Sequence, residues 1–208
     1  TENSEAYDYY LKGMNVLRMG DWTTKATAFA MANLDSAVMA DPSFALAWAE
    51  RSRAYSTAGF YNRRSEFKAK AKESFEQALK IDPQLARGHL AAGYYYNLID
   101  TDYEHALEEY SLARTELHND ASLLSDMAFV KLRQGMYTES QELFSRAVEL
   151  DPLNANFHTF RAEALQFGRL FGEAQKSMDR AVGIDPARAE LHRLRIEVAL
   201  KRTSEWAE

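Results

Sequence analysis

Four stretches of this chain share one pattern, an alanine followed four residues later by Asp-Pro: AVMADP at residues 37–42, ALKIDP at 78–83, AVELDP at 147–152 and AVGIDP at 181–186. Pro152 and Pro186 are 34 residues apart, and Pro83 and Pro152 are 69 apart, which leaves room for one more boundary between them. That boundary falls at ARTELH, residues 113–118, where His118 stands in place of proline. A fixed period of this length is typical of solenoids and repeat arrays. The sequence therefore predicts a chain of about five repeated units.

Each unit has the hydrophobic spacing of two amphipathic helices. Two helices that cross at roughly 8–10 Å can touch only where side chains are small, and larger neighbours fill the grooves beside the contact. Proline disfavours helix in the residue before it, so each Asp-Pro pair ends one helix and admits the next. The small residues expected at the helix contacts are Gly13, Ser52, Gly93, Ala128 and Ala162 on the first helices and Ala71, Ala106, Ser140 and Ala174 on the second.

The unit length, the small residues, the Gly-x-Tyr-like turn and the terminal Ala-x-x-x-Asp-Pro together resemble the tetratricopeptide repeat. The resemblance implies an all-α, right-handed superhelical solenoid of antiparallel helix pairs that forms a single domain over residues 1–208. The expected units are approximately 6–42, 43–83, 84–118, 119–152 and 153–186, followed by a capping helix at 187–202. The alternative for this last segment is the first helix of a truncated sixth unit.

Turns within the helix pairs are expected at residues 20–22, 59–60, 102–103, 135–137 and 168–171, where a glycine or aspartate precedes an aromatic. The first unit carries extra residues around 23–31 and the second around 61–66. Insertions in a repeat map to loops on one face, often a binding face. Tyr61, Arg63 and Arg64 therefore form an expected insert loop suited to an acidic surface or a phosphate, with a plain solvated loop as the alternative.

The resemblance also implies a concave groove lined by the first helices, where partner peptides or helices bind in this family. Aromatic and arginine side chains dominate the binding energy of protein interfaces. The alternative is that several of the aromatics only pack between units. The expected partner-binding residues are Tyr10, Arg53, Arg87, Tyr94, Asn97, Phe129, Arg133 and Phe160.

The residues offer little for catalysis or for other classes of ligand. The net charge of −6 disfavours nucleic-acid binding, and the absence of cysteine removes thiolate metal sites and disulfides. No apolar run approaches the ~18 residues of a membrane span. The five histidines form no metal motif, and His89, His158 and His192 are expected to pack at the starts of first helices. We therefore predict no enzyme activity, no cofactor, no metal, no nucleic acid and no membrane insertion.

These observations favour a protein–protein interaction scaffold. The alternative is a small-ligand sensor that holds a metabolite between Arg53, Arg87, Tyr94 and Arg133, and a third interpretation is a self-assembling structural element. The irregular first pair and the stretch ALAW at 45–48 resemble the repeat regions attached to bacterial regulatory proteins with a cyclase, kinase or DNA-binding head. That resemblance implies a regulatory module of a longer protein, cytoplasmic or, as the distal domain of a membrane-anchored regulator, periplasmic.

Overall fold

The structure is a computed structural model that describes residues 1–19, 24–62 and 64–204 of the 208-residue chain. Within these ranges the chain forms eleven α-helices and one π-helical turn, and no strand. The predicted all-α class of helical repeats is therefore confirmed. None of the helices in the described ranges combines the length and the hydropathy needed to cross a bilayer.

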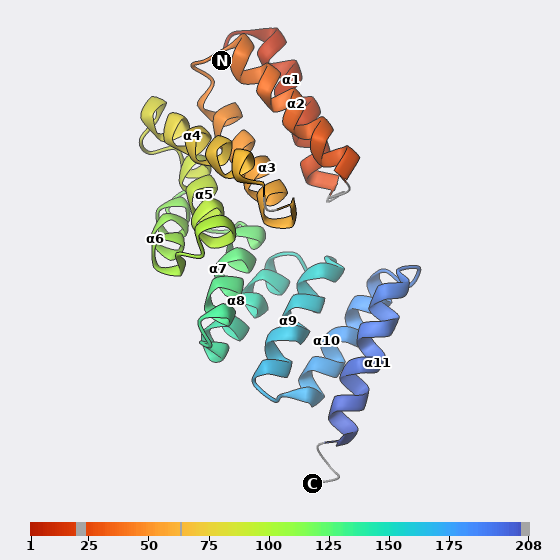
Figure 1. The fold of residues 1–208 in the computed structure, drawn as a ribbon. Helices are drawn as coiled ribbons and strands as arrows, with labels where there is room; N and C mark the ends of the chain where they lie inside the picture. Colours follow the sequence, from red (N-terminus) through yellow and green to blue (C-terminus); the bar gives the residue numbers. More distant parts are fainter. Residues whose placement is uncertain (20–23, 63, 205–208) are drawn as a thin grey trace. The chain divides into compact units, whose positions relative to one another are not determined.

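The helices follow one another as pairs that pack most extensively within each pair (Figure 1). Residues 1–117 and 118–208 form two compact units, with α1–α6 in the first and α7–α11 in the second. The single solenoid domain expected over 1–208 stays a prediction. The bounds are α1 Ser4–Met19, α2 Thr24–Ala40, α3 Ala45–Asn62, α4 Ser65–Ile81, α5 Ala86–Tyr95, η1 Tyr96–Asp100, α6 Tyr103–Ala113, α7 Ala121–Arg133, α8 Tyr137–Leu150, α9 Ala155–Phe167, α10 Phe171–Ile184 and α11 Ala189–Ser204.

The Asp-Pro pairs end the second helices as the sequence predicts. Asp82, Asp151 and Asp185 follow the last residues of α4, α8 and α10, with φ of −135°, −137° and −129°. Proline forces this extended backbone on the residue before it. The N–H of each aspartate still closes the last turn, because it donates to the carbonyl of the alanine four residues earlier. The repeated alanine thus sits in the final turn of each of these helices.

The core of the first unit is built from aromatic rings that pack on alanines. Tyr55, Phe75 and Tyr95 are buried together with alanines of α3, α4 and α5. Gly93 of α5 faces Tyr110 of α6 so closely that a Cβ atom there would lie 2.4 Å from the tyrosine ring. The small-residue position on this first helix is therefore what lets α5 and α6 approach each other.

The core of the second unit continues onto its last helix. Ala162, Leu165, Ala174 and Met178 of α9 and α10 pack with Val198 of α11. Leu191 of α11 joins a neighbouring cluster with Ala155, Ala181 and Val182. Burial of such aliphatic side chains stabilises a fold by about 1.5–3 kcal/mol each. Helix α11 therefore closes the core of this unit, and the choice between cap and truncated sixth unit stays open.

The extra residues of the second unit lengthen helices, and the expected insert loop is wrong at Tyr61. Helix α3 has 18 residues and α4 has 17, whereas α9 has 13 and α10 has 14. Gly59 and Phe60 lie inside α3, not in a turn, and Tyr61 lies on its last turn. Gly59 serves packing instead, since a Cβ there would lie 2.8 Å from Cδ1 of Ile99. The turn expected at residues 20–22 and the residue Arg63 lie outside the described residues.

The other expected turns lie where the sequence places them. Helices α6, α8 and α10 begin at Tyr103, Tyr137 and Phe171. Asp102 caps α6, since its side chain accepts a hydrogen bond from the His105 N–H. The π-helical turn η1 between α5 and α6 was not predicted. It ends at Asp100 and is followed by Thr101, which has a left-handed backbone with φ of 54°.

Candidate partner-binding groove

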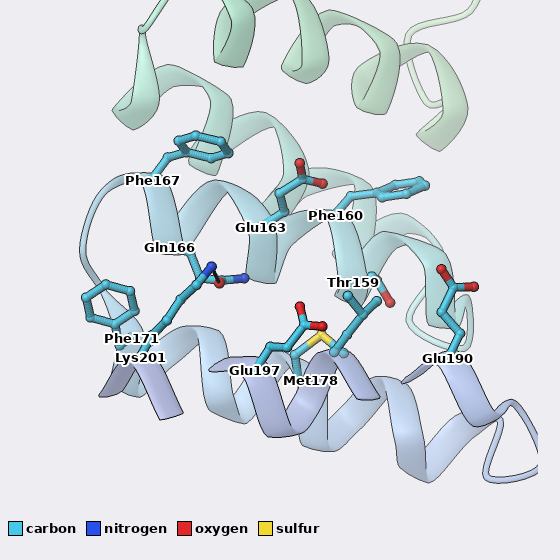
Figure 2. Close-up of a pocket in the computed structure, with 11 residues that line it drawn as sticks. Thr159, Phe160, Glu163, Gln166, Phe167, Phe171, Met178, Glu190, Glu197 and Lys201 are labelled. Atoms are coloured by element: carbon cyan, nitrogen blue, oxygen red, sulfur yellow. Dashed lines mark hydrogen bonds between the residues drawn. The ribbon is translucent and has the colours of Figure 1, made fainter. Parts of the chain in front are cut away.

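A groove of about 640 Å³ lies among α9, α10 and α11, entirely within the second unit (Figure 2). Its side chains recur every three or four residues on α9 and α11, the spacing that puts side chains on one face of a helix. Asn154 fixes the start of α9, because its side chain accepts a hydrogen bond from the Asn156 N–H. The groove is lined by Thr159, Phe160, Glu163, Gln166 and Phe167 of α9, Phe171 and Met178 of α10, and Glu190, Leu194, Glu197 and Lys201 of α11.

The apolar part of the groove rests on a cluster of aromatic rings. Phe160 is half-buried, and its ring centroid lies 4.8 Å from that of Phe129 in an edge-to-face arrangement. Phe167 is 54% exposed and stacks on Tyr137 at 5.9 Å. Leu194 faces this region from α11 and is half-buried. Contacts with neighbouring aromatic rings therefore support Phe160 and Phe167 of the groove.

The polar part of the groove is acidic. Glu163, Glu190 and Glu197 supply three carboxylates, and Lys201 supplies the one cation among the lining residues. Lys201 Nζ donates to Gln166 Oε1 at 2.9 Å, which links α11 to α9 (Figure 2). Loss of solvent around Glu163 raises the pKa of its carboxyl, and the positive charges of Arg133 and Lys201 partly offset that effect. The lining residues therefore carry three carboxylates and one ammonium, and Arg193 of α11 pairs with two of these carboxylates, Glu197 at 2.6 Å and Glu190 at 4.0 Å.

Comparison with known protein families identifies one of the repeats by its sequence. The model of the tetratricopeptide repeat family matches residues 52–85, which cover most of α3 and all of α4. The TTC0263 protein of Thermus thermophilus is a tetratricopeptide-repeat protein that superposes with a TM-score of 0.77 at 16% identity, over 94% of this chain and 99% of that chain. Residues 52–85 thus match a tetratricopeptide repeat, and the chain shares the fold of solved tetratricopeptide-repeat proteins.

Two further solved structures share the fold of this tetratricopeptide-repeat chain. Pseudomonas aeruginosa pilF has 22% identity and a TM-score of 0.69, over 96% of this chain and 85% of that one. YrrB has 21% identity and a TM-score of 0.58, over 95% of this chain and 94% of that one. No curated protein matches the sequence significantly. At these identities the likeness establishes the fold.

In the first unit, the tetratricopeptide pairs bring Arg53 and Tyr94 together. The Arg53 guanidinium lies 5.0 Å from the centroid of the Tyr94 ring, and its Nη1 donates to Glu50 Oε2 at 2.6 Å. Tyr94 also meets Tyr110 edge-to-face at 6.3 Å. Arg87 lies on α5 with Tyr94 and is half-buried. These three expected contact residues thus lie on two successive first helices, α3 and α5.

The remaining expected contact residues lie in varied surroundings. Tyr10 is half-buried and packs on Phe44 with ring centroids 5.1 Å apart. Asn97 is only 4% exposed, and its Nδ2 donates to the Tyr110 hydroxyl at 3.5 Å. Arg133, at the end of α7, is exposed and acts electrostatically on Glu163. Asn97 therefore lies in the interior, whereas the side chains of Tyr10 and Arg133 are at least partly accessible to a partner.

At the junction of α3 and α4, Tyr61 is 66% exposed and packs edge-to-face on Phe60 at 5.3 Å. Arg64 precedes α4, pairs with Glu66 at 3.3 Å and lies 5.3 Å from the centroid of the Phe67 ring. Both side chains are at the surface. Tyr61 lies in the last turn of α3 and Arg64 lies directly before α4, so of these two residues only Tyr61 departs from the predicted loop.

Sequence reasoning missed the contribution of α11 to the groove. This helix was expected to act as a cap, so Leu194, Glu197 and Lys201 were not considered as contact residues. Their three-to-four spacing was the available signal. Among the described residues, no group of three or more histidines, aspartates and glutamates could hold a metal ion. The absence of enzyme activity and of a cofactor stays a prediction.

Proposed function

We propose that this tetratricopeptide-repeat chain is a protein-interaction scaffold whose groove among α9, α10 and α11 binds a basic, amphipathic segment of a partner protein. The observation that carries the proposal is the juxtaposition of an apolar floor, at Phe160, Phe167 and Leu194, with three carboxylates and one lysine. The floor anchors apolar side chains of the segment, and the carboxylates select lysine and arginine beside them.

The size of the groove fits such a segment. Its volume lies within the roughly 300–1,000 Å³ of typical binding pockets, which is room for several side chains. The groove follows α11 from Glu190 to Lys201, a distance of about 16 Å at 1.5 Å per residue. Aromatic anchors in a well-packed pocket supply most of the energy of an interface. Charges on its rim add selectivity and a faster association rate.

One structural neighbour supports a peptide ligand. YrrB is described as a tetratricopeptide-repeat protein with an unusual peptide-binding site. The shared fold supports a peptide as the class of ligand. The carboxylates of the groove favour a peptide with positive charge. The small-ligand sensor, the self-assembling element, the attachment to a regulatory head and the compartment stay predictions.

The test is calorimetric titration of the full chain with a synthetic helical peptide of leucines and lysines. Phe167→Ala removes an exposed anchor, and we expect affinity to fall about tenfold, as for a typical interface hot spot. Phe29→Ala is the matched control, because Phe29 is a similarly exposed phenylalanine on α2 (52%) and should leave affinity unchanged. Equal binding by a peptide with glutamate in place of lysine would contradict the proposal.

The pH dependence of binding provides a second test. Because desolvation raises the pKa of Glu163 above its ordinary value of 4.5, this carboxyl loses its charge earlier than an exposed one as pH falls. The charge that favours a basic peptide is present above the raised pKa and lost below it. We expect affinity to weaken as pH falls from neutral toward the ordinary carboxyl pKa of 4.5, and Glu163→Gln to remove part of that slope. A slope that the substitution leaves intact would assign the effect to another group.

A further inference from the structure

A second cavity lies on the other side of α9, between α9 and α10, with a volume of about 390 Å³. At 100° per residue, His158 and Arg161 lie roughly opposite Phe160 and Glu163 on the helix. This cavity and the groove are both lined from α9 and α10, but they share no lining residue. This second cavity is lined by His158, Arg161, Glu173, Lys176, Ser177 and Arg180.

The charge of this cavity is positive. Arg161, Lys176 and Arg180 bring three cations, and Glu173 brings one carboxylate. Across the described residues, none of these three cations forms an ion pair within 4.0 Å, although many other surface lysines and arginines do. Like charges held together without partners repel each other, so an anion that enters the cavity would relieve that repulsion.

Buried nitrogen atoms without hydrogen-bond partners are an independent indication that this cavity binds a ligand. His158 is 6% exposed, and its Nε2 lies 3.0 Å from the Pro152 carbonyl oxygen. A carbonyl only accepts, so Nε2 carries the proton of this hydrogen bond. His158 Nδ1 and Arg161 Nε are both buried and have no hydrogen-bond partner. Buried polar groups in native proteins are almost always satisfied, and an exception often marks the place of a ligand or an ion.

We propose that this cavity binds a phosphate group, either free or as a phosphomonoester. Its oxygens accept from the guanidinium groups of Arg161 and Arg180, from the Lys176 ammonium and from the Ser177 hydroxyl. A hydrogen phosphate also donates an O–H, which suits the lone pair of Nδ1 when His158 is neutral. Glu173 limits the total positive charge of the site.

The experiment is an NMR titration of the full chain with inorganic phosphate at constant ionic strength. We expect saturable shifts of the backbone amides of residues 158–161 and 173–180. Arg180→Gln and Lys176→Gln change exposed side chains and should each weaken binding about tenfold, the value of one charge-assisted hydrogen bond. Arg193→Gln is the matched control, because it removes an exposed arginine of α11, outside the cavity, and should change affinity less than about twofold.

Two further ligands distinguish the sources of the phosphate group. Glycerol phosphate that binds more tightly than a phosphoserine peptide indicates a metabolite site, and the reverse order indicates a docking site for a phosphorylated protein. The proposal is overturned if shifts at about 20 mM phosphate equal those in chloride, or if Arg193→Gln weakens binding as much as Arg180→Gln. These results are independent of the basic-peptide groove, since the two sites share no residue.

Discussion

At the residue scale, one hydrogen bond recurs near the starts of α3, α5, α9 and α11. A ring N–H six residues after the repeat proline lies within hydrogen-bond distance of the carbonyl oxygen of that proline. This oxygen lies in the turn between two helices, where no helix hydrogen bond satisfies it. The position therefore selects for a ring that bears an N–H, which tryptophan and histidine share and phenylalanine lacks. The four rings are Trp48 at 3.0 Å, His89 at 3.1 Å, His158 at 3.0 Å and His192 at 2.9 Å.

A substitution at His192 separates this bond from simple ring packing. His192→Phe keeps an aromatic ring but leaves the Pro186 carbonyl without its donor, and we expect it to lower the free energy of unfolding by about 0.5–1.5 kcal/mol. His192→Trp restores an N–H, as Trp48 has in the same position of the repeat, and should recover most of that loss. Urea denaturation followed by circular dichroism measures both. Equal losses in the two variants would show that the hydrogen bond contributes nothing.

At the element scale, helix ends follow the sequence where a backbone constraint sets them. Proline fixes the ends of α4, α8 and α10, and these ends were predictable. Helix α3 was not, because Gly59 suggested a turn although its role is to accommodate Ile99, a contact from 40 residues further along the chain. The π-helical turn at residues 96–100 was hidden for the same reason. Tertiary contacts decide such features, and a local pattern does not contain them.

Two glycine substitutions test whether helix packing or helix propensity decides a small-residue position. Gly93→Ala forces a Cβ to within 2.4 Å of the buried Tyr110 ring, and we expect it to lower the free energy of unfolding by about 1–3 kcal/mol through overpacking. Gly183→Ala on α10 meets nothing within 4 Å and should raise it by about 0.4–1 kcal/mol. Thermal or urea denaturation measures whether each substitution lowers or raises the free energy of unfolding. Stabilisation by Gly93→Ala would mean that α5 and α6 shift apart at little cost.

At the scale of the whole molecule, the groove and the proposed phosphate cavity both lie in the second compact unit. The sequence placed Phe160 in a binding groove, and Phe160 lines the groove among α9, α10 and α11, while its role in partner binding stays a prediction. The groove residues of α11 were not predicted, since the groove was expected along the first helices of the five units and residues 187–202 were expected to form a capping helix. The phosphate cavity was not either, because the sequence shows that His158 is present but not that its Nδ1 is buried and unsatisfied.

The second unit should therefore fold and bind without the first. We expect a fragment of residues 118–208 to unfold cooperatively and to bind the leucine–lysine peptide within about threefold of the full chain. Removal of α11, in a fragment of residues 118–188, should abolish both properties. Leu191 and Val198 are 1% and 2% exposed, and their loss would uncover the apolar faces of α9 and α10 at about 1.5–3 kcal/mol each. Circular dichroism with urea and calorimetric titration distinguish the outcomes. Peptide binding by the 118–188 fragment at full affinity would place the binding surface away from α11 and contradict the groove.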